Sequence, residues 1–331
     1  MAKIGVTLSN RSVLMDIVKT EDLLRMAETA DTCDLLSHVW VGDSLMAIPR
    51  LESLTLLSAI ASRTTNIKIG TACMASLPLR DPIMLAYQWA TLDVLSSGRT
   101  ILGACMGGRR PTKTQLAEDN TMGIRNNQRA QRMEENIEIL RKLWTKDNVS
   151  FQGKFHTLKN AIIEPKPIQK TPPIWIASSP RLKSSNPLIA ERSLRRVSRM
   201  GDGWMTTAWL NYPGVVEEFR QLRTRIFEYA SQDGKELKNF PCSLYYFINI
   251  NDNRETAYEE SKHYLESYYS TKFSRLEVEN WVAFGSAEEC ASRLNTFIEA
   301  GATDILLSFP SWSPVRQLNC LIDEVLPKLN D

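Results

Sequence analysis

The sequence predicts an α/β protein that folds as a single (β/α)8 TIM barrel over residues 1–331, with insertions at the C-terminal face of the barrel. Strand-like and helix-like segments alternate along the whole chain, and eight such pairs can be recognised. No change in composition marks a second domain between them. A doubly wound open sheet also alternates in this way, but eight units without a domain break favour closure into a barrel.

The predicted strands are short runs of apolar, β-branched and aromatic residues. In chain order they are Lys3–Leu8, His38–Val41, Ile67–Cys73, Thr100–Cys105, Pro173–Ala177, Gly203–Thr207, Ser243–Ile250 and Asp304–Phe309. Barrel enzymes place their chemistry at the C-terminal ends of such strands, so residues at these ends are the first candidates for a site.

Helix signals follow each strand. Asp81 with Pro82 supplies an N-cap and a first-turn proline, and Ser286 with Glu289 forms a capping box. Thr20 is expected to cap the first helix. Further helices are predicted around Glu52–Ser62, Met133–Trp144, Asn186–Gly201, Val215–Ala230 and Thr256–Ser270, with a last helix running to about Lys328.

Two segments are too polar and aperiodic to count as ordinary connections. Residues 108–128 follow the fourth strand and are longer than a usual βα loop. Residues 270–285 form a second polar excursion. Both are candidate lids over the barrel mouth.

Composition excludes several classes of protein. The formal net charge is only +2, with 24% charged residues, which argues against a nucleic-acid binder that works through a strongly basic face. The start of the chain lacks the pattern of a secretory signal, and no apolar run approaches the length of a membrane span. The six cysteines are scattered and indicate reduced thiols, so we expect a cytoplasmic protein.

Familiar catalytic motifs are missing. The three histidines (His38, His156 and His263) lack the spacing of metal ligands, so no metal site is predicted. His38 lies within an apolar strand and is expected to be a core residue or to support a ligand from behind. No GxSxG elbow is present, and the glycines at 103, 107 and 108 do not have the spacing of a dinucleotide fingerprint.

Several segments do resemble one family, the bacterial luciferase-like superfamily of flavin-dependent oxidoreductases. They occur in the same order as in the family, and the segment Ile67–Gly108 is the most specific. The others are Trp40–Ser44, Pro172–Ser179, Arg195–Thr207 and Phe284–Leu307. The resemblance implies a TIM barrel that binds FMN or the deazaflavin F420 at its mouth and acts on a small-molecule substrate. It also implies a homo-oligomer, a dimer in many relatives.

The resemblance places the cofactor beside particular residues. In the family a bulge at the end of strand three, often with a non-prolyl cis peptide, supports the flavin ring, and here it falls at Ala72–Cys73. Met106, which directly follows the fourth strand in the same region, is also expected to contact the cofactor. The phosphate of the cofactor is expected near Ser178, Ser179 and Arg181, where hydroxyl groups, backbone N–H groups and a positive charge precede a helix.

Asp43 is the residue that the resemblance offers as catalytic. It ends strand two, where the family places polar residues that face the ring or the substrate. Aspartate is also a favoured helix N-cap, and that alternative stays open.

Two departures from the family pattern favour FMN over F420. Many F420-dependent members have histidine where this chain has Ser44, and several have glutamate just after strand four, where this chain has Met106-Gly107-Gly108. The sequence therefore predicts a monooxygenase that uses reduced FMN and O2, with a separate flavin reductase as its partner. The alternatives are an F420-dependent hydride-transfer enzyme resembling methylenetetrahydromethanopterin reductase, and a flavin-binding protein without catalysis.

Overall fold

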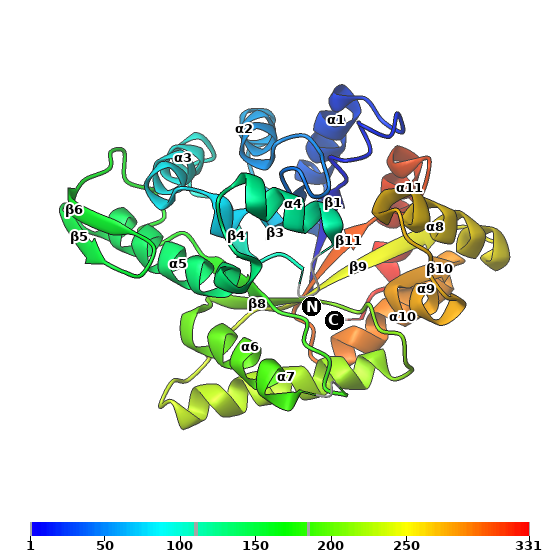
Figure 1. Cartoon of the computed structure of the whole chain (residues 1–331). Helices are drawn as coiled ribbons and strands as arrows, with labels where there is room; N and C mark the ends of the chain where they lie inside the picture. The colour runs from blue at the N-terminus through cyan, green and yellow to red at the C-terminus, as the bar shows by residue number, and fades with distance from the viewer. Residues whose placement is uncertain (1, 109–111, 184–185, 331) are drawn as a thin grey trace.

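Parallel strands close into a barrel at the centre of the computed structural model, which describes residues 2–108, 112–183 and 186–330 (Figure 1). Within this part of the chain the sheet has the order β10-β9-β11-β1-β2-β3-β4-β7-β8, and an additional pairing of β9 with β8 closes the ring. The barrel strands are β1 (Lys3–Leu8), β2 (Leu36–Asp43), β3 (Lys68–Met74), β4 (Thr100–Ala104), β7 (Ile174–Ala177), β8 (Gly203–Thr207), β9 (Cys242–Ile250) and β11 (Asp304–Ser308). The predicted (β/α)8 barrel is confirmed.

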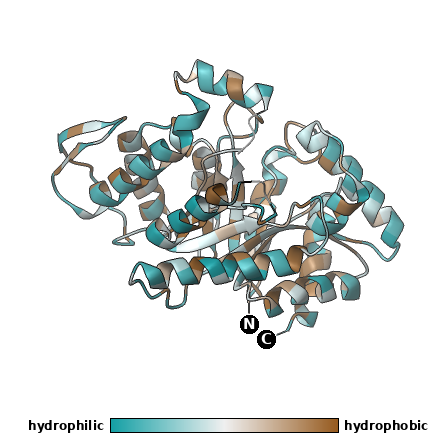
Figure 2. Ribbon diagram, turned by 60° about the horizontal axis from the view of Figure 1, so that its bottom comes forward, coloured by the Kyte–Doolittle hydropathy of each residue, from teal (hydrophilic) through white to brown (hydrophobic). Residues whose placement is uncertain are grey.

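Helices surround the barrel and present their apolar sides to it (Figure 2). They are α1 (Thr20–Asp31), α2 (Ser53–Arg63), α3 (Pro82–Leu95), α4 (Lys113–Thr121), α5 (Arg129–Thr145), α6 (Pro187–Met200), α7 (Val215–Gln232), α8 (Arg254–Tyr269), α9 (Arg275–Trp281), α10 (Ala287–Glu299) and α11 (Pro314–Cys320). Short turns of 3-10 or π type are η1 (Leu77–Leu79), η2 (Asn126–Gln128), η3 (Leu321–Val325) and η4 (Leu326–Lys328). In the described ranges, no helix combines the length and the apolar character that a membrane span requires.

The predicted helix starts are confirmed at two places and wrong at one. The Asp81 carboxylate accepts hydrogen bonds from the first turn of α3, and Ser286 forms its capping box with Glu289 at the start of α10. Thr20, expected as a cap, is instead the first residue of α1, and Lys19 precedes it in extended conformation. The Asp22 carboxylate accepts a hydrogen bond from the Lys19 backbone N–H, at 2.8 Å.

Three short strands were not expected from the sequence. Strands β5 (Val149–Gln152) and β6 (Thr157–Ala161) form an antiparallel hairpin beside α5, away from the barrel. Strand β10 (Val282–Gly285) pairs with the second half of β9, beyond the point where β9 leaves the ring. Each has only four or five residues, too few for an alternating pattern to stand out from its surroundings.

The segment 108–128 is not the aperiodic loop that its composition suggests, because it contains α4. The Thr112 hydroxyl caps this helix, and Arg129 forms buried ion pairs with Glu118 and Asp119. Glu118 also accepts hydrogen bonds from the backbone N–H groups of residues 46 and 47. Helix α4 is therefore held in place mainly by polar contacts. It lacks the apolar stripe by which a helix is recognised in a sequence. Residues 109–111 of this expected lid lie outside the described residues.

Two tryptophans fill the interior of the barrel. Trp40 on β2 and Trp175 on β7 lie with ring centroids 5.2 Å apart, in a buried cluster with Ile101, Met205 and Leu306. Glycine makes room for one of them: a Cβ atom on Gly70 would lie only 2.6 Å from the Trp40 ring. The interior is therefore a packed core, and any cavity must lie above it, at the mouth.

His38 lies next to this core and is fully buried, as its apolar strand suggests. Its ring is 5.6 Å from that of Trp40, and its Nε2 atom is 3.8 Å from the Asp304 carboxylate. Burial lowers the pKa of His38 to about 3, with smaller contributions from Lys68 and Lys3. The imidazole is therefore neutral at physiological pH.

This buried imidazole predicts a pH-dependent loss of stability. Between pH 6.5, near the pKa of an unfolded histidine, and about 3, only the unfolded chain binds the proton, so the free energy of unfolding falls as pH falls. Between pH 7 and pH 5 the wild type should lose about 2 kcal/mol more than the His38→Gln variant, by the linkage relation. Urea unfolding at both pH values measures this difference. If both proteins lost the same free energy of unfolding, His38 would take up its proton in the folded protein over the same pH range as in the unfolded chain.

Candidate functional site

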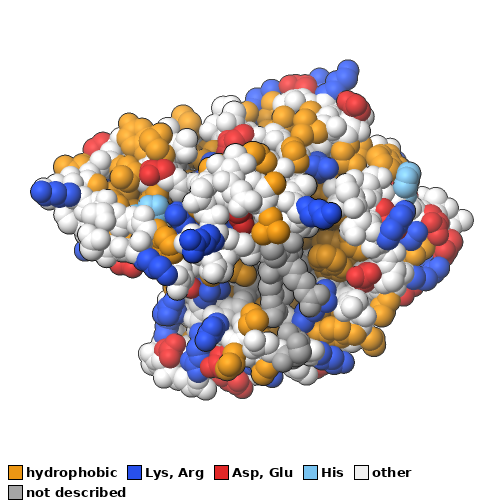
Figure 3. Space-filling model, viewed as in Figure 1, with side chains coloured by type: hydrophobic (Ala, Val, Ile, Leu, Met, Phe, Trp, Pro, Cys, Tyr) orange, Lys and Arg blue, Asp and Glu red, His pale blue; other side chains and the backbone are white. Residues whose placement is uncertain are grey.

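A cavity of about 210 Å³ lies at the C-terminal mouth of the barrel. Its walls come from the ends of β1, β2, β3, β7, β8, β9 and β11, and from α8 and α9. Figure 3 shows that hydrophobic side chains line a hollow near the centre of one face, with Lys and Arg side chains around it. The position is the one at which barrel enzymes bind their substrates.

The floor of the cavity rests on the packed interior of the barrel. Ala72, Cys73, Ala177 and Tyr245 line the cavity and also pack against the cluster that contains Trp40 and Trp175. Three of these four side chains are small, so they leave space above the two tryptophans. Larger side chains at the same positions would fill this space.

One wall is the irregular end of β3. The register of β3 shifts against both neighbouring strands before Met74, and the peptide bond between Ala72 and Cys73 is cis. The bulge that the resemblance implies is therefore confirmed at the expected position. A hydrogen bond with the Cys105 thiol, together with burial, raises the pKa of Cys73, so this thiol stays protonated at the cavity wall.

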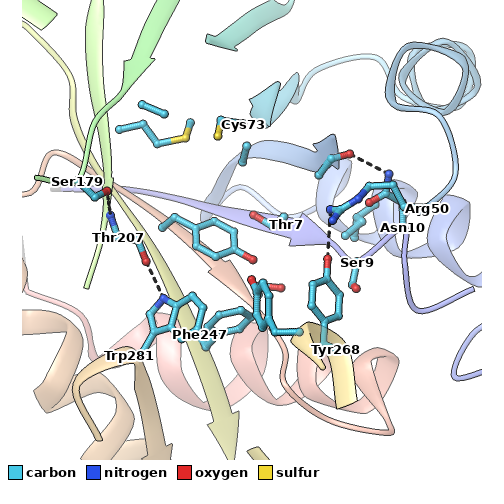
Figure 4. Close-up of a pocket in the computed structure, with 18 of the residues that line it drawn as sticks. Thr7, Ser9, Asn10, Arg50, Cys73, Ser179, Thr207, Phe247, Tyr268 and Trp281 are labelled. Carbon is cyan, nitrogen blue, oxygen red and sulfur yellow. Dashed lines mark hydrogen bonds between the residues drawn. The ribbon is translucent and has the colours of Figure 1, made fainter. Parts of the chain in front are cut away.

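Several polar residues form another side of the cavity (Figure 4). Asn10 donates to the carbonyl oxygens of Gly42 and Leu51, and Arg50 donates from Nη1 to the Tyr268 hydroxyl, at 3.2 Å. Two atoms here, Thr7 Oγ1 and Asn10 Oδ1, are buried and have no hydrogen-bond partner among the described residues. Such atoms are free to bind a ligand.

Tyrosines from β9 and α8 complete this side. The Tyr264 hydroxyl lies 3.1 Å from Ser9 Oγ and 2.9 Å from Ser12 Oγ. Burial raises the pKa of Tyr264 to about 12 and raises the pKa values of Tyr245 and Tyr269 further. These three phenols therefore keep their protons at neutral pH and can donate hydrogen bonds.

An aromatic wall closes the opposite side. Phe247 packs edge-on against Trp281, with ring centroids 4.9 Å apart, and the Trp281 indole donates to Thr207 Oγ1 at 2.6 Å. Trp281 belongs to the segment 270–285 that the sequence suggests as a lid, and it reaches the cavity from the end of α9.

The structure brings three of the predicted cofactor residues to the cavity, namely Ala72, Cys73 and Ser179. The Ser179 hydroxyl also accepts hydrogen bonds from Thr206 Oγ1 and the Thr207 backbone, which fixes the loop after β7 on β8. Their contact with a cofactor stays a prediction.

Three other predicted cofactor residues are not among those that line the cavity. Met106 is partly buried against the main core. Ser178 is buried, with its hydroxyl against Ser193 Oγ. Arg181 donates to the Asn211 side chain at 3.3 Å, at the surface. The loop that contains Arg181 leads to α6, but residues 184 and 185 lie outside the described part of the chain.

Asp43, the predicted catalytic residue, also does not line the cavity. Its buried carboxylate accepts hydrogen bonds from Ser53 Oγ at 2.7 Å and from the Ser76 backbone N–H at 2.8 Å. Arg80 forms an ion pair with it at 2.9 Å. These contacts tie the end of β2 to α2 and to the segment after β3. The helix α2 is capped by Glu52, so Asp43 is not its N-cap, and a catalytic role of Asp43 stays a prediction.

Apart from Ser179, the polar residues of the cavity were not predicted from the sequence. Arg50 lies in the loop between β2 and α2, where no motif marks it. Tyr264, Tyr268 and Tyr269 were visible as a tyrosine-rich helix, and the spacing of four residues places Tyr264 and Tyr268 on one face of α8. That face could be recognised only once the position of α8 over the mouth was known.

Comparison with known proteins gives the family of the chain. The chain matches the family described as Luciferase-like monooxygenase over residues 3–304. It is 26% identical to an F420-dependent glucose-6-phosphate dehydrogenase from Amycolatopsis mediterranei (strain U-32), over 93% of this chain and 94% of that protein. A second F420-dependent glucose-6-phosphate dehydrogenase, from Kribbella flavida, is 24% identical over 84% of this chain and 83% of its own length.

Solved structures give the same fold. An F420-dependent secondary alcohol dehydrogenase, in complex with an F420–acetone adduct, superimposes with a TM-score of 0.78 at 18% identity, over 100% of this chain and 99% of that one. At this level of identity the likeness shows the fold alone.

The relatives overturn the predicted FMN-dependent monooxygenase activity, because they are named as F420-dependent dehydrogenases. The departures at Ser44 and at Met106-Gly107-Gly108 were misleading. They concern residues expected to exchange protons, and another side chain can take over such a role without a change of cofactor. The family match covers most of the chain and agrees with the barrel, with the bulge at Ala72–Cys73 and with the cavity at its mouth. The chain therefore belongs to the luciferase-like monooxygenase family, and it is an oxidoreductase.

Proposed function

We propose that the protein is an F420-dependent oxidoreductase that transfers a hydride between the deazaflavin and a small alcohol or carbonyl compound. The observation that carries the proposal is the similarity, over 93% of the chain, to a relative named as an F420-dependent dehydrogenase. The solved alcohol dehydrogenase of the same fold, which contains an F420–acetone adduct, is consistent with this reaction type.

The cavity fits the flat ring of such a cofactor. Ala72, Cys73 and Ala177 offer small side chains beside the bulge of β3, and Met205 lies next to them in the same wall. Thr7 Oγ1 and Asn10 Oδ1 are buried polar atoms without partners among the described residues, as expected of atoms that bind a ligand. These residues would hold the ring.

Bound F420 supplies a carbon that accepts or donates a hydride. The chain has to exclude water and handle the proton of the substrate hydroxyl. Phe247 and Trp281 make one side of the cavity apolar. Tyr245, whose pKa is raised by burial, keeps its phenolic proton and can donate a hydrogen bond to a carbonyl oxygen. The Ser9–Tyr264–Ser12 row offers further hydroxyl groups at the cavity edge.

Binding of cofactor to the purified protein tests the proposal. We expect F420 to bind at least tenfold more tightly than FMN, which corresponds to about 1.4 kcal/mol, as measured by titration of cofactor fluorescence. Ala177→Phe should abolish binding, because the new ring fills the cavity beside Cys73. Ala117→Phe, on the exposed face of α4, is the matched control and should bind F420 normally. Tight FMN binding without F420 binding would refute the proposal.

A homo-oligomer remains part of the proposal, and the surface of α3 supports it. Ile83, Met84, Tyr87, Val94 and Leu95 are all exposed on this one helix, with Met84 57% and Leu95 58% accessible. Apolar side chains that gather in this way mark an association surface. The separate flavin reductase expected from the sequence depends on the FMN interpretation and is not carried further.

Light scattering coupled to size-exclusion chromatography measures the oligomeric state. The wild type should elute as a dimer, and Met84→Glu combined with Leu95→Glu should shift it to the monomer, because each change buries a charge in the interface. Leu14→Glu, at an exposed apolar residue far from α3 in sequence, is the control. A monomeric wild type, or a double variant that remains dimeric, would contradict this assignment.

A further inference from the structure

The charge of the cavity lining is unusual for a site that would bind a sugar phosphate. Among the described residues that line the cavity, Arg50 is the only one with a charged side chain. The rest are small, hydroxyl-bearing, amide, aromatic or aliphatic residues, the aliphatic ones being Leu8 and Met205. A phosphate dianion on a polyhydroxy chain calls for several cations and many polar partners, whereas this cavity offers one cation and a largely apolar wall.

Arg50 is held at the cavity by neutral groups. Its Nε donates to the Ile48 carbonyl at 3.1 Å and its Nη1 to the Tyr268 hydroxyl at 3.2 Å, with the guanidinium 5.9 Å from the centre of the Tyr268 ring. Gly42 lies directly against the Arg50 guanidinium: a Cβ atom added to Gly42 would be only 2.3 Å from Arg50 Nη1. The absence of a side chain at Gly42 is what lets the guanidinium occupy this place.

Arg50 forms no direct ion pair with a described residue. Burial disfavours its charge, but Tyr268, Tyr269 and Asp43 nearby outweigh this effect and raise the pKa of the guanidinium. No carboxylate of the described residues lies within 4.0 Å of its guanidinium. The nearby Asp43 is paired with Arg80 instead, at 2.9 Å. Nη2 of Arg50 has no hydrogen-bond partner among the described residues, so part of its planar donor set remains available. Such a set matches a carboxylate, which can accept two parallel hydrogen bonds.

The remainder of the cavity suits a flat apolar body. The rings of Tyr245 and Phe247 pack edge to face, with their centroids 5.4 Å apart. The ring of Phe247 also packs edge-on against Trp281. Figure 4 shows Phe247 and Trp281 across the cavity from Cys73, with the Arg50–Tyr268 pair on a further side. A planar molecule can therefore contact aromatic side chains while one end reaches Arg50.

We propose that the substrate is an aromatic or similarly flat alcohol or ketone that carries one carboxylate, and that Arg50 binds this carboxylate. The carboxylate of the substrate would neutralise the positive charge of Arg50. The aromatic side chains of the cavity would pack on the apolar part of the substrate. This inference rests on the proposed function for the alcohol or ketone group, but the anion site itself can be tested without cofactor.

The test uses 4-acetylbenzoate and its neutral counterpart 4′-methylacetophenone as probes. Calorimetric titration of the cofactor-free protein should show at least tenfold tighter binding of the carboxylate. Arg50→Gln should reduce this preference to about twofold or less, and Arg50→Lys should retain part of it, because lysine keeps the charge but not the planar donors. Arg11→Gln is the matched control: Arg11 stacks on the same Tyr268 ring at 5.5 Å but does not line the cavity, so its preference should equal that of the wild type.

A second variant guards against a fold defect in Arg50→Gln. Gly42→Ala keeps the charge and forces the guanidinium aside, so it should also lose the preference. Equal binding of both probes by the wild type, or an unchanged preference in both variants, would overturn the inference. Loss of F420 binding in Arg50→Gln with an unchanged probe preference would also overturn it, because Arg50 would then serve the cofactor. If the wild type selects the carboxylate but does not bind F420, the anion site stands and the proposed function fails.

Discussion

The packed interior of the barrel is the constraint on which the site depends. Trp40 and Trp175 fill the space between the strands, and Gly70 leaves room for the first of them. Because the interior is full, the cavity at the strand ends lies above these rings. Small residues at that level, Ala72 and Ala177, keep it open. The same packing that stabilises the barrel therefore sets the floor of the cavity.

The barrel could be predicted because its pattern is repeated eight times. Each strand has a short apolar run, and caps such as Asp81 and Ser286 mark where helices begin. Elements outside this repeat were missed. Helix α4 depends on ion pairs of Arg129 with Glu118 and Asp119, and β10 forms only because β9 extends beyond the ring. Contacts of this kind join residues that a local pattern does not connect.

The site was predictable only in part, for a similar reason. The resemblance to the family pointed to Ala72, Cys73 and Ser179, and these three residues do line the cavity, although their contact with a cofactor stays a prediction. Whether a strand-end residue faces the cavity depends on its partners: Asp43 is turned to Arg80, Ser53 and Ser76, and its neighbour Gly42 lines the cavity instead. Arg50 and the tyrosines of α8 come from connections whose course the sequence does not reveal. The cofactor was misjudged because two absent proton donors were taken as a sign of FMN.

The central claim is that the mouth of this barrel binds a deazaflavin ring at the bulge of β3 and leaves Arg50 for the substrate. A crystal structure of the protein with F420 measures this directly. The expected result is a ring in van der Waals contact with Ala72 and Cys73, with the Arg50 guanidinium free of the cofactor. A ring bound outside the cavity, or a cofactor phosphate on Arg50, would contradict the claim.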